Sequence, residues 1–505
     1  MPMRPETVRA LLAQGDDEAP ALLDVSGAAL TYGDLREAVE HLRAELARCG
    51  VGRGDTIALL LPNGPELVVA FLAAVTAGAV APLNPAYRAE ELRFYLGDLR
   101  PRALITRGDL GAEARGAAPE GIALLELGGD ARSPSLAGPS GVAADRGEPA
   151  ADDVALLLHT SGTTARPKLV PLTQRNLAAS ASNIASWLQL GPADRCLNVM
   201  PLFHIHGLMA AVLASLAGGA SVVATPGFDG FKFFEWLGRL EPTWYSAVPT
   251  MHQLILERAP RHEDVLAAQR LRFIRSSSAG LPPSVFAALE QRFGAPVIES
   301  YGMTEATHQM ASNPLPGRVP GLERRAGTVG VAAGAEIRIL DPEGRPLTAG
   351  ERGEVAIRGA GVTRGYVENP EANAAAFSDG WFRTGDEGYL GEDGALTLTG
   401  RLKELINRGG EKVAPLEVDD ALLQHPAVAQ AVAFAVPHPK LGEEVGAAVV
   451  LAEGQVVEAS ELRAFAAERL AAFKVPRSIV IVDEIPKGPT GKLQRIGLAE
   501  RLGLA

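Results

Sequence analysis

The sequence predicts an α/β fold: a large N-terminal domain of parallel sheets covered by helices plus a small β-rich subdomain, and a small mobile α+β C-terminal domain. Three observations lead to this prediction. Short β-branched and aliphatic runs alternate with amphipathic stretches up to about Gly327, which favours parallel strands joined by helices. Short strands separated by Gly, Pro and Asp turns follow. From Leu402 a mixed pattern returns over about 100 residues, the size of a small domain.

The length of 505 residues is too great for one ordinary core. We therefore expect an N-terminal domain over residues 1–400 and a mobile C-terminal domain over residues 402–505, with a hinge near 401–403. The segment 115–149 is rich in Gly, Ala and Pro and predicts a loop-rich connection.

The elements follow from local patterns in chain order. An amphipathic helix is expected over residues 32–49, ahead of a first strand at 56–61. The apolar stretch 67–83 contains Thr76, Gly78 and Pro82 and is shorter than the roughly 20 residues of a membrane span, so it predicts a buried helix running into a strand. Further helices are expected at 176–189, 283–293, 416–424 and 459–470. Further strands are expected at 155–159, 221–224, 244–248, 272–276, 296–299, 336–340, 354–358, 395–399, 430–436, 445–451 and 478–483.

Composition excludes several classes of protein. A net charge of −12 argues against a nucleic-acid binder, because such proteins need a basic surface. The two cysteines, Cys49 and Cys196, exclude a disulfide scaffold, and Cys196 is interpreted as a buried small hydrophobic residue rather than a nucleophile. The N-terminus lacks the zones of a signal peptide. We expect a cytoplasmic protein, monomeric or homodimeric, without a membrane span.

The strongest local motif for chemistry runs from His159 to Lys168, HTSGTTARPK, directly after an apolar run. A strand, a Ser/Thr/Gly loop and then a lysine form the layout of a phosphate-binding loop, in which hydroxyls and backbone N–H groups surround phosphates. The spacing is not that of a Walker A loop. The alternative is a polar surface turn.

Four weaker motifs follow in order. Tyr301-Gly302-Met303-Thr304-Glu305 comes after the strand at 296–299, where a carboxylate can hold Mg²⁺ against phosphate oxygens. Asp386, in Thr384-Gly385-Asp386, can accept hydrogen bonds from ribose hydroxyls. The other two are Gly400-Arg401-Leu402-Lys403-Glu404, with Gly409-Gly410 after it, and a Gly/Pro loop that ends at Lys492.

Together, in this order and spacing, the five motifs resemble those of the acyl-adenylate-forming superfamily of acyl- and aryl-CoA synthetases, luciferases and peptide-synthetase adenylation domains. The resemblance covers essentially the whole chain and implies an AMP-forming acid–thiol ligase. Such an enzyme uses ATP, Mg²⁺ and coenzyme A with a small carboxylic acid. Its catalytic residues would be Lys492, Glu305, Thr160 and His204.

The resemblance also implies individual roles. Glu305 would bind the metal, Tyr301 would stack on adenine, and Asp386 and Arg401 would clamp the ribose. Lys403 would be the hinge, and Gly409 and Gly410 would line the CoA tunnel. The full set of ATP-binding residues would be Thr160, Ser161, Gly162, Thr163, Thr164, Lys168, Tyr301, Thr304, Asp386, Arg401 and Lys492.

Within the superfamily the sequence is most similar to oxalate–CoA ligases, through the segments 201–207, 243–250, 273–279 and 303–308. We expect His204 to be a gate and His206, Ser278 and His308 to line the acid pocket, where their donors suit a short dicarboxylate. The alternative is that both histidines are core residues satisfied by backbone. Arg275 is either a contact for an anion or a solvated strand end.

Four other functions remain open. A medium-chain or aryl-acid CoA ligase would share the ATP residues but tolerate bulk in its pocket. An amino-acid adenylation domain, which does not use CoA, would need an acidic residue near 203–210, and that segment has none. A luciferase-like oxygenase is the third alternative. A catalytically inactive regulatory homologue is the fourth, and it would not need the complete set of ATP residues.

Overall fold

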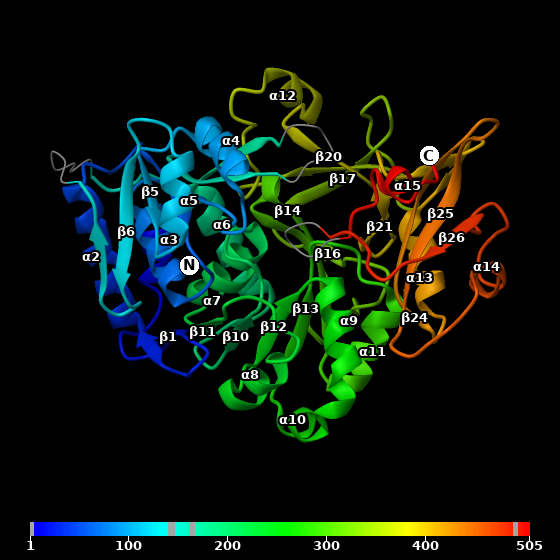
Figure 1. The fold of residues 1–505 in the computed structure, drawn as a ribbon, viewed down its shortest axis with the longest axis horizontal. Helices are drawn as coiled ribbons and strands as arrows, with labels where there is room; N and C mark the ends of the chain where they lie inside the picture. Colours follow the sequence, from blue (N-terminus) through cyan, green and yellow to red (C-terminus); the bar gives the residue numbers. More distant parts are fainter. Residues whose placement is uncertain (1–4, 140–146, 161–166, 488–492) are drawn as a thin grey trace.

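The computed structural model describes residues 5–139, 147–160, 167–487 and 493–505. A seven-stranded sheet in the order β7-β6-β5-β3-β4-β8-β9 forms the first half of the large domain (Figure 1). Its inner strands pair in parallel, and the edge strands β7 and β9 pair antiparallel. The strands are β3 (Thr56–Leu60), β4 (Ala79–Pro82), β5 (Ala103–Thr106), β6 (Ala123–Gly129), β7 (Pro134–Ala137), β8 (Val154–His159) and β9 (Leu169–Thr173).

A nine-stranded sheet in the order β16-β15-β14-β13-β12-β10-β11-β1-β2 forms the second half. The run from β14 to β1 is parallel, and antiparallel strands close both edges. The strands are β1 (Pro20–Leu23), β2 (Ala29–Thr31), β10 (Arg195–Asn198), β11 (Ser221–Ala224), β12 (Trp244–Ala247), β13 (Phe273–Ser276), β14 (Val297–Met303), β15 (His308–Ser312) and β16 (Val331–Ala332).

Helices α2 (Tyr32–Arg48), α3 (Pro65–Ala77) and α6 (Gln174–Trp187) contact both sheets and form the layer between them. Apolar residues surround α3 on all sides, and Leu67 to Ala77 are all buried, as expected of a helix between two sheets. The π-helix η1 (His206–Leu213) and α7 (Ala214–Ala217) continue this layer on the second sheet. The main core lies here.

The outer faces carry the remaining helices of the large domain. Helices α4 (Ala89–Leu99) and α5 (Leu110–Ala117) cover the first sheet. The second sheet is covered by α8 (Phe233–Leu240), α9 (Pro249–Arg258), η2 (Ala259–Arg261), α10 (Glu263–Ala268) and α11 (Pro283–Phe293).

A five-stranded sheet follows in the order β17-β18-β20-β19, with β21 paired to β20, and it is the predicted β-rich subdomain. All its pairs are antiparallel. It consists of β17 (Glu336–Leu340), β18 (Gly353–Arg358), α12 (Pro370–Ala376), β19 (Phe377–Ser378), β20 (Trp381–Leu390) and β21 (Leu396–Arg401).

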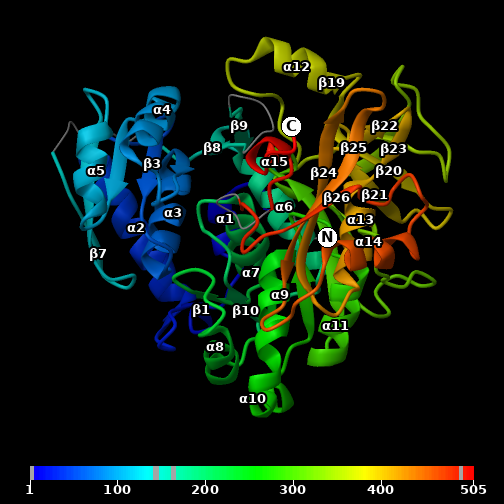
Figure 2. The same ribbon diagram turned by 45° about the vertical axis from the view of Figure 1, so that its right-hand side comes forward.

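The last sheet has its own core and lies beside β20 and β21 (Figure 2). Its elements are β22 (Ile406–Arg408), β23 (Glu411–Val413), α13 (Pro415–Leu423), β24 (Val428–His438), β25 (Gly442–Leu451), α14 (Ala459–Ala467), β26 (Ser478–Ile481) and α15 (Leu498–Arg501). It meets the large domain where Asp420 accepts a hydrogen bond from Ser284 (3.2 Å) and where Lys412 pairs with Glu387 (3.3 Å).

Two predictions about elements were wrong. The segment 115–149 is not merely a connection, because it contains β6 and β7, which complete one edge of the first sheet. The strand expected to end at residue 299 continues to Met303, because Ser300 to Met303 pair with β15. The apolar stretch 67–83 is a buried helix followed by a strand, as predicted.

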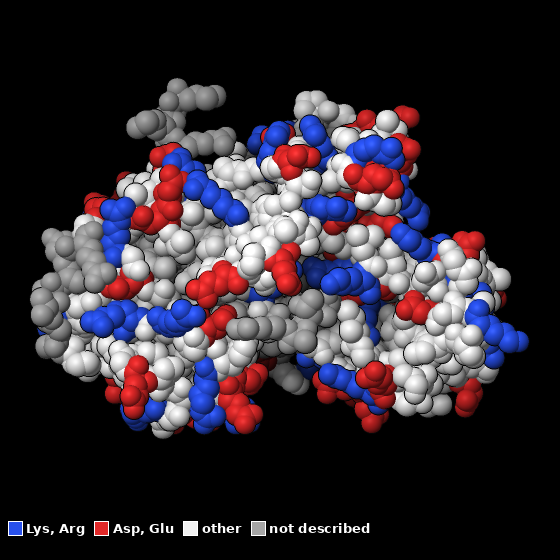
Figure 3. Space-filling view, turned by 90° about the horizontal axis from the view of Figure 1, so that it is seen from above, with Lys and Arg blue, Asp and Glu red and all other residues white. Residues whose placement is uncertain are grey.

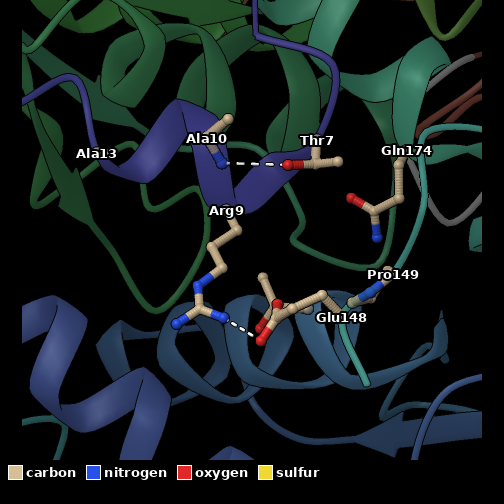
Figure 4. Close-up of a pocket in the computed structure, with 8 residues that line it drawn as sticks. Thr7, Arg9, Ala10, Ala13, Glu148, Pro149 and Gln174 are labelled. Carbon is tan, nitrogen blue, oxygen red and sulfur yellow. Dashed lines mark hydrogen bonds and ion pairs between the residues drawn. The ribbon is translucent and has the colours of Figure 1, made fainter. Parts of the chain in front are cut away.

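The N-terminal helix α1 (Val8–Leu12) borders a cavity of about 380 Å³ (Figure 4). The Thr7 hydroxyl caps the helix by accepting from Ala10 N (3.2 Å), and Arg9 forms an ion pair with Glu148. The Gln174 side chain accepts a hydrogen bond from Val8 N and donates one to Val75 O. None of the predicted site residues that the structure describes lines this cavity.

Acidic and basic side chains are interspersed over the described part of the face seen in Figure 3. None of the helices within the described ranges combines the length and apolar character that a bilayer crossing requires.

Candidate active site

The ends of the predicted phosphate loop meet in a β-hairpin. Thr160 follows β8, and Lys168 precedes β9. Two hydrogen bonds join them: Thr160 N donates to Lys168 O (2.9 Å), and Lys168 N donates to the Thr160 hydroxyl (3.4 Å). The backbone N–H of Thr160 is therefore used inside the hairpin. Four predicted phosphate contacts lie outside the described residues: Ser161, Gly162, Thr163 and Thr164.

Glu305, the predicted metal ligand, lies in the short 3₁₀-helix η3 (Thr304–Ala306) after β14 and is buried. Its Oε1 accepts a hydrogen bond from the Tyr366 hydroxyl (2.9 Å). Burial raises the pKa of Glu305, while hydrogen bonds and the charges of Arg401 and Lys168 oppose that shift. A buried carboxylate of this kind gains from a cation, so the site fits Mg²⁺.

The described residues contain no cluster of three acidic, His or Cys side chains that could hold a metal ion. A magnesium ion at Glu305 would therefore take its other ligands from phosphate oxygens and water, which is usual for Mg²⁺ at nucleotide sites.

Asp386 and Arg401, the predicted ribose residues, are paired across the β20–β21 register. Arg401 Nε lies 3.1 Å from Asp386 Oδ1. The hydroxyl of Tyr301, at the end of β14, donates to the other oxygen of the same carboxylate (2.5 Å). The charge of Asp386 raises the pKa of Arg401. Three residues from motifs far apart in sequence thus meet at one point.

Tyr366 was not predicted from the sequence, yet it connects two of the motifs. Its hydroxyl contacts Glu305, and the Lys168 ammonium lies 4.5 Å from the centre of its ring, within cation–π range. The signal available was the Gly-Tyr pair at 365–366 in the segment between β18 and α12. An aromatic residue after glycine is too common to indicate a site alone.

The predicted acid pocket brings together residues from three elements. His206 begins the π-helix η1, a geometry common at functional sites. Its Nδ1 lies 2.9 Å from the Ser278 hydroxyl and its Nε2 lies 2.6 Å from Ser246 Oγ. The rings of His206 and His308 are 4.9 Å apart.

The described hydrogen bonds of these two rings are with side chains. His206 is bound by two serines, and His308 Nδ1 lies 3.5 Å from Arg275. Both rings are buried, and their role in binding the acid stays a prediction. Arg275 is not a solvated strand end either, because it is fully buried.

The backbone around this pocket is held in an uncommon conformation. Ser278, Thr307 and His308 have φ values of 75°, 51° and 89°, in the left-handed region. Such residues cost about 1–3 kcal/mol each and cluster at functional sites. Gly302, opposite, has no room for a side chain, since a Cβ there would lie 2.0 Å from His308 O.

The other predicted residues are less enclosed. His204 is half-buried and its Nδ1 accepts from His206 N (3.3 Å). Lys403 is exposed between β21 and β22. Gly409 and Gly410, with φ of 61° and 97°, form the two-residue turn of the β22–β23 hairpin. Lys492 lies outside the described residues.

Cys196 is fully buried on β10, and burial raises the pKa of its thiol well above the ordinary range. A thiol in this state is a poor nucleophile, which supports its interpretation as a small core residue.

Comparison with known proteins matches nearly the whole chain. The family model for the AMP-binding enzyme matches residues 11–367, and that for the AMP-binding enzyme C-terminal domain matches residues 417–492. A Humulus lupulus protein named "Probable CoA ligase CCL9" is 49% identical over 93% of this chain and 91% of its own. An oxalate–CoA ligase of Arabidopsis thaliana is 47% identical over 94% of each chain.

Two more matches extend the comparison. A sulfoacetate–CoA ligase of Cupriavidus necator is 40% identical over 98% of this chain and 97% of its own. The crystal structure of ATP-bound MatB from Rhodopseudomonas palustris superposes with a TM-score of 0.86 at 30% identity, over 99% of both chains.

Proposed function

The chain belongs to the AMP-binding enzyme family, and on that premise we propose that it is an ATP-dependent carboxylate–CoA ligase with oxalate as its acid. It forms an acyl-adenylate and then transfers the acyl group to the thiol of coenzyme A. The relatives that act on oxalate and sulfoacetate, two small acids with a second anionic group, support this assignment.

The observation that carries the choice of acid is the polar pocket formed by His206, Ser278 and His308. Both histidines are buried, Ser278 is half-buried, the group is rich in hydrogen-bond donors, and the cation Arg275 lies beside His308. A long-chain or aryl acid would place an apolar group against these buried polar side chains and offer them no second carboxylate.

In the first step a carboxylate oxygen attacks the α-phosphorus of ATP and pyrophosphate leaves, so two anions must approach each other. Lys168 and the loop 160–164 bind the phosphates, while Asp386, Arg401 and Tyr301 orient the nucleoside. Mg²⁺ at Glu305 neutralises phosphate charge when bound. Lys492 stabilises the charge that develops at the α-phosphate, and one such contact is worth about 3–4 kcal/mol.

In the second step the CoA thiol attacks the acyl carbonyl and AMP leaves. One static arrangement cannot serve both steps, so we assign residues 402–505 as a mobile domain that turns about Lys403. In one orientation it presents Lys492; in the other the Gly409–Gly410 turn lines the CoA path. Both glycines have positive φ, which few other residues adopt. A cytoplasmic location and a monomeric or homodimeric state belong to the proposal, and cell fractionation and size-exclusion chromatography check them.

The test is acid-dependent pyrophosphate release, with and without CoA, across oxalate, malonate, acetate, octanoate and cinnamate. A preference for oxalate, with thioester made only when CoA is added, is the expected result. A preference for octanoate or cinnamate would retain the ligase and reject the dicarboxylate pocket. Turnover with oxalate but no thioester would indicate an adenylating enzyme that does not use CoA.

A further inference from the structure

Arg275 is a fully buried arginine in the layer between the two large sheets. Because side chains alternate along a strand, Phe273 and Arg275 share one face of β13. Phe273 belongs to the main core on that side. On the neighbouring strand β12, Ser246 is the register partner of Arg275, and its side chain points to the same face of the sheet.

Every described partner of Arg275 is uncharged or an imidazole. Its Nη1 donates to Ser246 Oγ (3.4 Å), and its Nη2 donates to Gln309 Oε1 (3.2 Å) and contacts His308 Nδ1 (3.5 Å). Its Nε is buried without a hydrogen-bond partner. Among the described residues, no Asp or Glu pairs with it. Burial lowers the pKa of Arg275 to about 9, so it remains a cation at neutral pH.

An unneutralised buried cation disfavours folding, so its retention indicates a use. Its contacts lead to the acid pocket by two routes. Ser246 also contacts His206 Nε2 (2.6 Å), and His206 contacts Ser278, while His308 contacts Arg275 directly. Arginine can only donate, so Nδ1 of His308 is the acceptor and the proton of this ring lies on Nε2.

We propose that Arg275 is a specificity-determining positioning residue. Ser246 and His308 connect it to the acid pocket, and the second anionic group of the acid neutralises its positive charge. This inference rests on the proposed function and names the acid class that the same pocket selects. A monoanionic acid of equal shape leaves the buried cation uncompensated, so it is bound less well.

The experiment compares acids that differ in charge and hardly in shape: oxalate with its monoamide oxamate, and malonate with malonamate. Adenylation is followed by pyrophosphate release for the wild type, Arg275→Met, Arg275→Lys and the control Arg270→Met, which removes an exposed arginine five positions away. In Arg275→Met the KM for the diacid is expected to rise about a hundredfold, which lowers kcat/KM for the diacid by the same factor. The kcat/KM for the monoamide should hardly change, so the preference for the diacid disappears. Arg275→Lys should retain part of it, and Arg270→Met all of it.

A thermal-shift assay provides a readout that does not need turnover. Arg275→Met is expected to unfold no earlier than the wild type without ligands, because it removes an unpaired buried charge. Its stabilisation by ATP should be unchanged, while its stabilisation by the diacid should be lost.

The possible results separate the two proposals. Loss of diacid and monoamide turnover by the same factor in Arg275→Met would overturn the role of Arg275, as would a wild type that prefers monoamides. A wild type that prefers malonate, with the preference lost in Arg275→Met, would reject oxalate and retain Arg275. If no acid is turned over, the ligase proposal falls, and the diacid-specific thermal shift then decides for or against Arg275.

Discussion

At the residue scale, Tyr366 connects two groups of opposite charge, Glu305 and Lys168. It donates to Glu305, lies under Lys168 and comes from a loop that the motif analysis did not use. Its position could not be read from the sequence, because 61 residues separate it from Glu305 and only tertiary packing brings them together.

Tyr366→Phe is expected to lower adenylation about tenfold and to raise the Mg²⁺ concentration that half-saturates it. The variant loses a hydrogen bond to a charged group, worth about 1.5–3 kcal/mol. Pyrophosphate release measured across a Mg²⁺ titration checks this, with Tyr389→Phe as the control. An unchanged Mg²⁺ requirement would contradict the link between Tyr366 and the metal ligand.

Glu299 is a second buried group with a consequence at this scale. Its Oε1 accepts from Leu281 N (2.8 Å), its Oε2 has no hydrogen-bond partner, and burial raises its pKa from 4.5 to about 8. A folded-state pKa above the unfolded one means that the native state binds the extra proton. Its contribution to stability is therefore greatest below pH 4.5 and is lost as the pH rises through about 8.

Glu299→Gln, which cannot ionise, should remove this pH dependence. Relative to the wild type, its free energy of unfolding is expected to increase by about 3 kcal/mol between pH 6 and pH 9. Urea denaturation at the two pH values measures it, with the exposed Glu336→Gln as control. The same difference from wild type at both pH values would show that Glu299 is already ionised at pH 6.

At the scale of elements, the β14–β15 hairpin sets the geometry of the acid pocket. Its register shifts between Tyr301 and Gly302, and this places Gly302 against the backbone of His308. The sequence indicated a strand and a following motif, but a chain rich in Gly, Met and Thr gives no sign that the strand continues. The strands β6 and β7 were missed for a related reason, because Gly and Pro dominate their surroundings.

Gly302→Ala is expected to destabilise the protein by about 1–3 kcal/mol and to weaken oxalate binding more than ATP binding. The Cβ added at position 302 would clash with the carbonyl of His308, and only a movement of the backbone can relieve this clash. Thermal unfolding and ligand-induced shifts measure both effects. Gly97→Ala, where an added Cβ meets nothing within 4 Å, is the control and should be neutral or slightly stabilising. Equal losses for both ligands would place the effect on the fold alone.

At the scale of the whole molecule, the predicted architecture is confirmed: helix-covered parallel sheets, an antiparallel subdomain and a separate C-terminal sheet. Hydrophobic periodicity and turn residues sufficed because each layer is locally encoded. The burial of Arg275 was not predictable, because a single arginine at a strand end is usually solvated.

Lys492→Ala is expected to abolish adenylation and to spare thioester formation from a preformed adenylate. The two steps use different orientations of the small domain, and Lys492 acts only in the first. The two half-reactions, measured separately with synthetic acyl-adenylate, check this. Loss of both by the same factor would contradict the two-orientation mechanism.

The described contacts of the predicted acid pocket come from η1 and the residues before it, from β12, from β13 and the loop after it, and from β15. In the proposed function the acid is therefore recognised by one continuous stretch of chain between His204 and Gln309. The phosphate hairpin, the ribose pair and the C-terminal domain lie outside it. A single exchange of the corresponding gene segment between relatives would therefore carry acid preference as a unit. Recombination can change the substrate of such an enzyme in one event, while Lys168, Asp386 and Arg401 are inherited from the recipient.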